Sequence, residues 1–415
     1  MIEINSSKSL RLLMIVPAYY GGTGDAVNER QLSLALAGRS KSVYVIAFVG
    51  LKQIFTSRRR ELKVDMPRNM KVIPIMMPCP PPFFIPLVMI TYSFFVALIA
   101  VIFKILDIID AVYVRNSLLA VGPLIFKKQI KNLATAIPGF VGDELSSTIK
   151  NRTLRSFVKS LCDKVDQQVI HRTEILLVHG SFFGEKLRQK HGFTDDKCLL
   201  SVAPGVDMRK IEKIREQVEP TKELRIGFIG SLVWWQGVDI LVEAMRVVQE
   251  SHPEAQLYIV GDGPMLKLIK SLTKRCSVNA VLTGTLNHDD ALKLLGTFYA
   301  LVIPSRSASN TETKIPMKLV EAFALGVPVL ITKHKVVVSL FKNEEDVLYI
   351  DDPSPSGVAE KILEIIEKPL LREKLRKNEL KLANNFDYDK IARRLINVIE
   401  KTVDKNKNPS KVKNS

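Results

Sequence analysis

The sequence predicts an α/β protein made of two domains, each built on a parallel sheet. Its 415 residues exceed what one hydrophobic core usually supports, so two domains are expected. Short runs that are apolar throughout alternate with longer amphipathic runs, which is typical of parallel strands covered by helices on both faces. This alternation breaks once, after residues 198–207, and restarts at residue 224. The break divides the two predicted domains.

The first predicted domain covers residues 1–207. Its strand candidates are short runs of mainly apolar residues: 12–16, 43–48, 110–114, 133–137 and 174–178. Gly21, Gly22 and Gly24 form a turn after the first strand, where the backbone can approach a ligand closely. A helical pattern follows this turn.

A polar, charged stretch at 208–223 is the predicted linker, and the second domain is expected over 224–385. Its strand candidates follow the same pattern: 224–230, 256–261, 278–284, 299–304 and 327–332. A last helix is predicted over 386–403. The lysine-rich tail 404–415 has almost no apolar residues, and we expect it to be disordered.

The charge of +17 is high, and most of the excess of Lys and Arg lies before Gly205. A basic first domain indicates an anionic partner such as a membrane surface or a phosphorylated lipid. No nucleic-acid recognition motif accompanies the charge, so a nucleic-acid partner is not expected.

The four cysteines show no C-x-x-C spacing and no His cluster, so reduced thiols and no metal site are predicted. The first residues lack the pattern of a secretory leader, which predicts a cytoplasmic protein.

Residues 83–106 form an almost uncharged segment, because Lys104 is the only charged residue between Lys71 and Asp107. Its length suits a transmembrane helix. Strand candidates on both sides of it belong to one sheet, which a single crossing would split between the two sides of the membrane. Insertion from one side only and burial in the core remain as alternatives, and the absence of a polar stripe favours insertion.

Three segments of the second domain carry binding chemistry. Residues 227–245 place Gly230 at a strand end and Gly237 at a helix start, where free N–H groups favour a phosphate. Residues 259–265 contain a second turn with Gly261 and Gly263. Residues 303–332 lead through a long polar loop into a helix bearing Lys318 and Glu321, which lie on one helical face.

In this order, the three segments resemble the donor half of the family-four retaining glycosyltransferases, which have the GT-B fold of two Rossmann-like domains facing across a cleft. The resemblance also extends to 198–207 and 386–390. It implies that the second domain binds a nucleotide sugar, with Lys318 on the diphosphate and Glu321 on the ribose. It also implies that the final helix packs back on the first domain.

Two departures from the family pattern concern the donor site. Ser231 and Gln236 stand where many members carry Arg and Lys. Thr313 stands where the first of two glutamates is expected, and Glu312 lies one position away, so Glu312 is the candidate for the sugar contact. The groups left to stabilise the diphosphate are cationic or dipolar: the helix start at Gly237, Lys318, Arg306 and Lys314.

The first domain offers fewer candidates. Asp143 is the candidate catalytic carboxylate, with Glu144 beside it, and Arg115 is a cation on the acceptor side. All three follow strand candidates, where open α/β sheets bind ligands. His179 also follows a strand, but a structural role explains it equally well.

Together these observations predict a retaining glycosyltransferase that needs no cofactor and no metal. Its expected acceptor is a lipid or a lipid-linked glycan at the cytoplasmic face of the membrane, where the protein would be peripheral or monotopic. Two alternatives remain: a catalytically impaired glycosyltransferase-like scaffold on a membrane, and a sugar-nucleotide epimerase of similar architecture.

Overall fold

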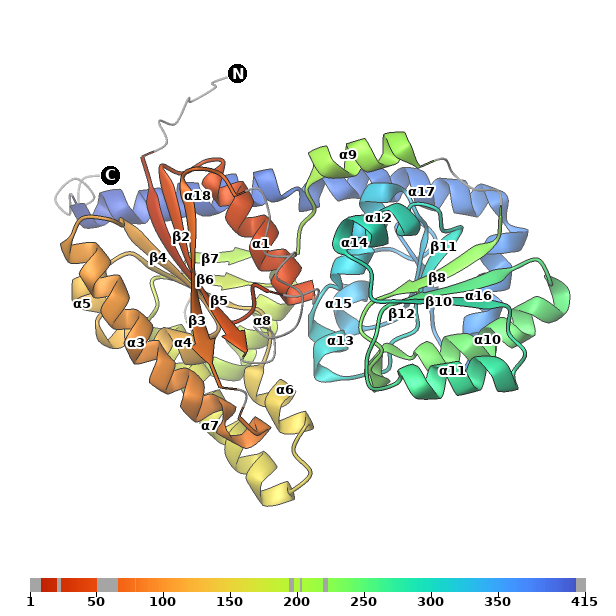
Figure 1. Ribbon diagram of the computed structural model, residues 1–415, viewed down its shortest axis with the longest axis horizontal. Helices are drawn as coiled ribbons and strands as arrows, with labels where there is room; N and C mark the ends of the chain where they lie inside the picture. The colour runs from red at the N-terminus through yellow and green to blue at the C-terminus, as the bar shows by residue number, and fades with distance from the viewer. Residues whose placement is uncertain are drawn as a thin grey trace. The chain divides into compact units, whose positions relative to one another are not determined.

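A computed structural model describes residues 9–20, 24–50, 66–78, 80–193, 198–201, 204–218 and 223–407. The chain divides into two compact units, the first formed by residues 25–203 with the N-terminal strand and the segment from Tyr388, the second by residues 204–387 (Figure 1). Each unit is a parallel sheet with helices on both faces, which confirms the predicted fold class. Gly21, Gly22 and residues 408–415 of the predicted tail lie outside the described residues.

The first unit contains a seven-stranded sheet in the order β3-β2-β1-β4-β5-β6-β7. Its strands are β1 (Arg11–Val16), β2 (Ser42–Gly50), β3 (Met70–Met77), β4 (Ala111–Arg115), β5 (Leu133–Ile137), β6 (Ile175–Val178) and β7 (Cys198–Ser201). Its helices are α1 (Gly24–Ala37), η2 (Pro82–Phe84), α3 (Ile85–Ile105), α4 (Ser117–Ile125), α5 (Lys127–Ile130), α6 (Val141–Ser147), α7 (Arg152–Arg172), α8 (Gly180–His191) and α18 (Tyr388–Lys407).

Strand β3 is an element that the sequence pattern did not predict. It contains Pro74, which lacks the N–H that a central strand would need for its ladder. Within the described residues, β3 lies at the edge of the sheet and pairs with β2. An edge strand tolerates a proline. The edge position of β3 is visible only in the assembled sheet.

Helix α18 covers one face of the first sheet. Its buried residues recur at helical spacing and join the core formed by β1, β2 and α1: Tyr388, Ile391, Ala392, Leu395, Ile396, Ile399 and Val403. Tyr388 Oη donates a hydrogen bond to Asn28 Oδ1 at 3.0 Å. The helix continues to Lys407, beyond the expected end at residue 403, so the first residues of the predicted tail are helical.

Helix α3 lies on the opposite face of the same sheet. Its inner residues Val96, Ala97 and Ala100 are fully buried. It approaches α4 so closely that a Cβ on Gly122 would lie 2.2 Å from the carbonyl oxygen of Ser93. Ser93 Oγ in turn accepts a hydrogen bond from the Gly122 N–H at 3.0 Å. Glycine at position 122 therefore permits the tight packing of α3 on the domain.

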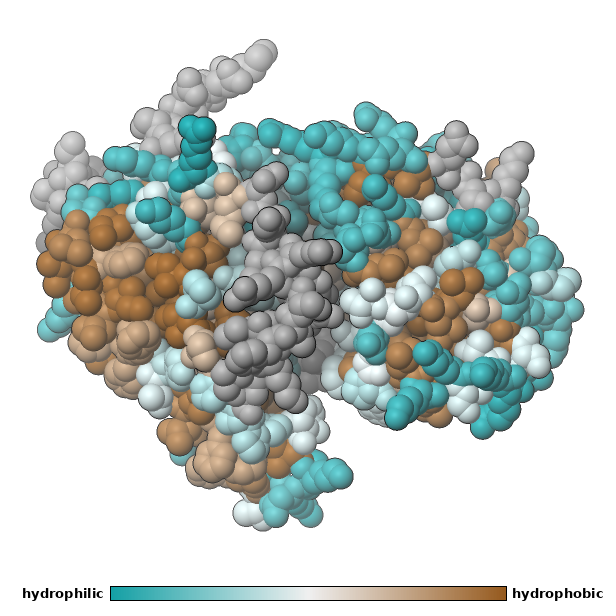
Figure 2. Space-filling model, viewed as in Figure 1, coloured by the Kyte–Doolittle hydropathy of each residue, from teal (hydrophilic) through white to brown (hydrophobic). Residues whose placement is uncertain are grey.

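The outer side of α3 is apolar and exposed. Large hydrophobic side chains recur along one stripe with exposures between 41% and 76%: Leu87, Phe94, Phe95, Leu98, Ile102 and Ile105. Figure 2 shows this hydrophobic surface gathered over the helix. Among the described residues, one helix, Pro82–Ile105, is long and apolar enough to cross a membrane by length and composition alone, with a mean hydropathy of 2.5.

The second unit contains a six-stranded sheet in the order β10-β9-β8-β11-β12-β13. Its strands are β8 (Arg225–Ile229), β9 (Gln256–Val260), β10 (Ala280–Gly284), β11 (Ala300–Ile303), β12 (Val329–Thr332) and β13 (Leu348–Ile350). Its helices are α9 (Met208–Gln217), η3 (Trp234–Gln236), α10 (Val238–Ser251), α11 (Leu266–Arg275), α12 (His288–Leu295), α13 (Ser309–Thr313), α14 (Met317–Leu325), α15 (Lys335–Val338), α16 (Pro355–Glu367), α17 (Pro369–Ala383) and η4 (Asn384–Phe386). Helix α9 occupies most of the predicted linker and belongs to this unit.

Candidate functional site

The candidate site lies at the carboxyl ends of the strands in the second unit, the edge at which open α/β sheets bind ligands. Gly230 follows β8 and Gly261 follows β9. Gly261 has φ +136°, and a Cβ there would lie 2.0 Å from the carbonyl oxygen of Gly230. The two strand ends can therefore meet only with glycine at position 261. Ser231 and Gly263 continue these two turns, and Ser231 is exposed.

Lys318 reaches this edge from the first turn of α14. Its ammonium donates a hydrogen bond to Gln236 Oε1 at 2.9 Å and lies 3.9 Å from the centre of the Phe228 ring. A Cβ on Gly230 would come within 2.8 Å of Lys318 Nζ. The glycine that ends β8 therefore makes room for the lysine.

The charge of Lys318 is poorly compensated. Burial lowers the pKa of its ammonium to about 7, and the nearby Glu321 carboxylate offsets only part of this effect. Within the described part of the chain, Lys318 forms no salt bridge, and its hydrogen-bond partner Gln236 is neutral. A phosphate oxygen placed beside it would favour the protonated form.

Gly237 precedes α10 in the left-handed conformation, with φ +67°. A Cβ at this position would lie 2.0 Å from the carbonyl oxygen of Pro304. The glycine thus lets the loop after β11 pack directly against the start of a long helix. The Asp239 carboxylate accepts hydrogen bonds from the N–H groups of Asp239 and Ile240 at this helix start, so anion binding here stays a prediction.

Arg306 pairs with residues of η3 and of the first turn of α10. Its guanidinium makes two hydrogen bonds to Asp239, at 2.8 and 2.7 Å, donates to the carbonyl oxygen of Trp234 and stacks on the Trp234 ring. Burial alone would raise the pKa of Asp239, but the hydrogen bonds from Arg306 hold it below its ordinary value. Arg306 therefore stabilises the loop around Gly237 through these contacts. The charge of Lys318, by contrast, is poorly compensated.

Glu321 lies on α14, one turn after Lys318, and is 8% exposed. Its Oε1 pairs with His288 Nε2 at 2.7 Å. His288 is the first residue of α12, just after β10, and we did not identify it from the sequence. This pair fixes the direction of a carboxylate that can accept hydrogen bonds from a ligand.

Glu312 belongs to a second network. Its carboxylate accepts hydrogen bonds from the Lys335 N–H at 3.0 Å, from Ser307 Oγ at 2.8 Å and pairs with His334 Nδ1 at 3.2 Å. Burial raises the pKa of Glu312, and these hydrogen bonds more than offset that effect and lower it overall. The other ring nitrogen of His334 bonds Ser305 Oγ at 2.8 Å. Glu312 thus ties the 305–313 loop to α15, and its contact with a sugar stays a prediction, as does any role of Thr313 or Lys314.

Arg115 and Asp143, two candidates in the first unit, have partners inside that unit. Arg115, at the end of β4, is 3% exposed and forms ion pairs with Glu29 and with Asp25, the latter at 2.7 Å. Asp143, in the first turn of α6, pairs with Lys159. Gly24 is the exposed first residue of α1. Roles of these residues toward an acceptor remain predictions.

Among the residues that the structure describes, no three His, Cys, Asp or Glu side chains lie together in a way that could hold a metal ion. The residues that sequence reasoning missed, His288 and His334, share one signal. Each follows the carboxyl end of a strand, β10 or β12. That position could have marked them as candidates.

Comparison with known proteins finds a family match for most of the second unit. Residues 209–382 match the family described as glycosyl transferases group 1. An uncharacterized glycosyltransferase of Methanocaldococcus jannaschii is 27% identical over 179 residues, which is 42% of this chain and 44% of that protein. A GDP-mannose-dependent alpha-(1-6)-phosphatidylinositol monomannoside mannosyltransferase of Mycobacterium tuberculosis is also 27% identical, over 40% of this chain and 46% of its own length. The chain thus matches just under half of the length of each relative.

The fold resembles that of solved structures over nearly the whole chain. Sucrose-phosphate synthase from Thermosynechococcus elongatus superimposes with a TM-score of 0.71 and 16% identity, covering 94% of this chain and 98% of that one. At this identity the likeness concerns the fold alone. The resemblance drawn from the sequence motifs is confirmed, and so is the GT-B fold class.

Proposed function

Because residues 209–382 match the family of glycosyl transferases group 1, we propose that the chain transfers a sugar from a nucleotide-sugar donor to an acceptor hydroxyl, with retention of the anomeric configuration. The observation that carries this proposal is Lys318, whose only partly compensated ammonium lies between Gly230 and Gln236 at the carboxyl edge of the second sheet. A diphosphate supplies the negative charge that this arrangement lacks. All the relatives reported above whose names state an activity are transferases, which does not favour an epimerase.

In this proposal the diphosphate lies against Lys318 and the N-terminus of α10, and Glu321 accepts hydrogen bonds from the ribose hydroxyls. The bond between the anomeric carbon and the diphosphate oxygen breaks, and a bond to the acceptor oxygen forms on the same face. The acceptor proton passes to the departing phosphate oxygen. Lys318 stabilises the negative charge that develops on this leaving group. The reaction requires neither metal nor cofactor.

The acceptor is proposed to be a lipid or a lipid-linked glycan. The mycobacterial relative is named for a phosphatidylinositol mannoside acceptor, which supports an acceptor of this kind. The outer stripe of α3 supports it independently, because a water-soluble domain gains nothing from an exposed row of Phe94, Phe95 and Leu98. Exposed Lys128 and Lys131 lie on and after α5, which packs beside α3.

These features fit a helix that inserts its outer face into one leaflet at the cytoplasmic side of the membrane. Apolar side chains enter the interface, and each lysine near an anionic surface contributes about 1 kcal/mol. The inner face of α3 is packed on the domain, and β3 and β4, which flank the helix in the chain, belong to the same sheet. One-sided insertion keeps this sheet intact.

The donor assay is release of nucleoside diphosphate from a panel of nucleotide sugars, with and without lipid extract. We expect one donor to be consumed and the rate to rise with lipid extract and to persist in EDTA. Glu321→Ala should weaken donor binding about tenfold to a hundredfold while the protein stays folded. No release from any donor under any condition would favour the impaired scaffold.

The membrane assay is co-sedimentation with vesicles that contain anionic phospholipid. The double variant Phe95→Asp/Leu98→Asp should abolish binding, since two charges would enter the hydrocarbon boundary. Leu370→Asp is the matched control, because Leu370 is an 87% exposed leucine on α17, a helix of the second unit. Equal sedimentation of both variants would refute a role of α3, and the glycosyltransferase proposal would stand without it.

A further inference from the structure

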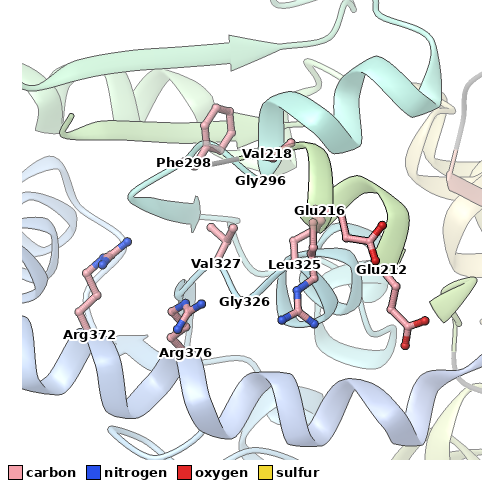
Figure 3. A pocket seen from close by; sticks show the side chains of 11 residues that line it. Glu212, Glu216, Val218, Gly296, Phe298, Leu325, Gly326, Val327, Arg372 and Arg376 are labelled. Atoms are coloured by element: carbon pink, nitrogen blue, oxygen red, sulfur yellow. The ribbon is translucent and has the colours of Figure 1, made fainter. Parts of the chain in front are cut away.

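The second unit contains a cavity of about 400 Å³ that has no part in the proposed reaction (Figure 3). Phe298 and Val327, which line it, precede β11 and β12, so the cavity lies at the amino ends of these strands. Gly230 and Lys318 lie at the carboxyl ends. The cavity also touches Leu325 at the last turn of α14, the end opposite to Lys318. It is therefore separate from the proposed donor site.

One wall of the cavity is cationic. Arg372 and Arg376 are spaced by four residues on α17, so both side chains project from one face of this helix, and Figure 3 shows both beside the cavity. Arg215, on α9, also lines the cavity. Three guanidinium groups thus border one space.

These charges are only partly compensated. Arg372 donates from Nε to the carbonyl oxygen of Tyr299 at 3.2 Å and stacks 4.0 Å from the centre of its ring. Burial lowers the pKa of Arg372, and among the described residues no carboxylate forms a salt bridge with it or with Arg215. Arg376 forms a long ion pair with Glu373, at 3.4 Å.

The remaining lining is of two kinds. Phe298, Leu325 and Val327 supply apolar surface. Glu212 and Glu216, on the exposed side of α9, also line the cavity and bring negative charge to it. An anion would therefore lie on the α17 side, away from these two carboxylates.

We propose that this cavity binds a small organic anion, with a phosphate or carboxylate group against Arg372 and Arg376 and an apolar part against Phe298 and Val327. The guanidinium fork suits the bidentate recognition of both anionic groups. The cavity has room for a molecule rather than an ion alone. This site goes beyond the proposed function and does not depend on it.

The test is calorimetric titration of the full chain with phenyl phosphate, and with inorganic phosphate for comparison. We expect phenyl phosphate to bind more tightly, because only phenyl phosphate can cover the apolar wall. Arg376→Gln and Arg372→Gln should each weaken binding by about tenfold. Arg246→Gln is the matched control, since Arg246 also has a long ion pair, lies on the exposed side of α10 and does not line the cavity.

Lys318→Met separates the two sites of the second unit. If phenyl phosphate binds in the cavity, this variant binds it as well as the unaltered protein does. Loss of binding in Lys318→Met would place the anion at the donor site and overturn the proposal, as would undiminished binding in Arg376→Gln. Absence of any binding by the unaltered protein would overturn it too. Should Arg372→Gln fold poorly through loss of its contact with Tyr299, the more solvent-accessible Arg376 still decides the outcome.

Discussion

Arg115 in the first unit and Lys318 in the second unit are both cations near the carboxyl ends of strands, yet their surroundings differ. Arg115 is paired with two carboxylates of α1, Asp25 and Glu29. Lys318 is paired with the neutral amide of Gln236. The positive charge of Arg115 is therefore neutralised by carboxylates of the same unit, whereas that of Lys318 can still be neutralised by a ligand.

The pKa directions follow from this difference. Burial alone would lower the pKa of Arg115, but Glu29 and Asp25 raise it above its ordinary value. Burial likewise acts on Lys318, where the influence of Glu321 is too small to reverse it, and its pKa falls to about 7. A buried charge without a counter-charge is costly, so Lys318 gains more from an arriving anion than Arg115 can.

The largest expected effect is on stability, from Arg115→Met. Glu29 is fully buried and would keep an uncompensated carboxylate, so the free energy of unfolding should fall by about 3–5 kcal/mol. Urea denaturation measures this change. Lys159→Met is the control, because it breaks the more exposed pair with Asp143 and should cost less than about 1 kcal/mol. Equal urea midpoints for Arg115→Met and Lys159→Met would show that the charge of Arg115 is not needed to compensate Glu29.

The next effect concerns donor binding in Lys318→Met. Removal of the cation beside the diphosphate should weaken binding of the preferred nucleotide sugar by about tenfold to a hundredfold. The free energy of unfolding should not fall, since an uncompensated charge is replaced by an apolar chain of similar length. Calorimetry and urea denaturation measure the two quantities. A destabilised variant with normal donor affinity would assign Lys318 the structural role of Arg115.

The pH dependence of donor binding should be smaller and specific to Lys318. A diphosphate favours the ammonium form, so affinity should be highest below pH about 7 and should fall above it, by about tenfold per pH unit at most. The free energy of unfolding depends on pH with the opposite sign. The unfolded chain binds a proton at Lys318 that the folded chain lacks between pH about 7 and about 10, so this residue makes the free energy of unfolding rise with pH in that window. Both slopes should vanish in Lys318→Met; their persistence would point to another group.

The smallest effect is expected from Gln236→Ala. It removes the hydrogen-bond acceptor that directs the Lys318 ammonium, while the cation itself remains. Donor affinity should fall by about twofold to tenfold, the range of a single hydrogen bond. Gln249→Ala is a suitable control, because Gln249 lies near the last turn of α10 and bonds the backbone of Ala255 and Asn279 instead of Lys318. A loss as large as that in Lys318→Met would mean that Gln236 itself binds the donor.

Much of the fold was predictable because parallel strands buried on both faces leave a local pattern. β1, β2, β4, β5 and β6 appear in the sequence as continuous apolar runs. β3 did not, since Pro74 and the half-exposed alternation of this edge strand hide it. The final helix was visible from its spacing of apolar residues, and its extension to Lys407 was not, because the lysine-rich end gives no periodic signal.

For the candidate site, the sequence by itself determined which residues stand at strand ends and helix starts, and it named Gly230, Gly237, Lys318 and Glu321. Only the tertiary structure decided their partners. Lys318 meets Gln236 across 82 positions of the chain, and Glu321 meets His288 across 33. Local periodicity carries no information about such distant pairs. Whether a cation is neutralised within the fold or left for a ligand depends on which side chains the sheet brings beside it, and that is settled only when the strands assemble.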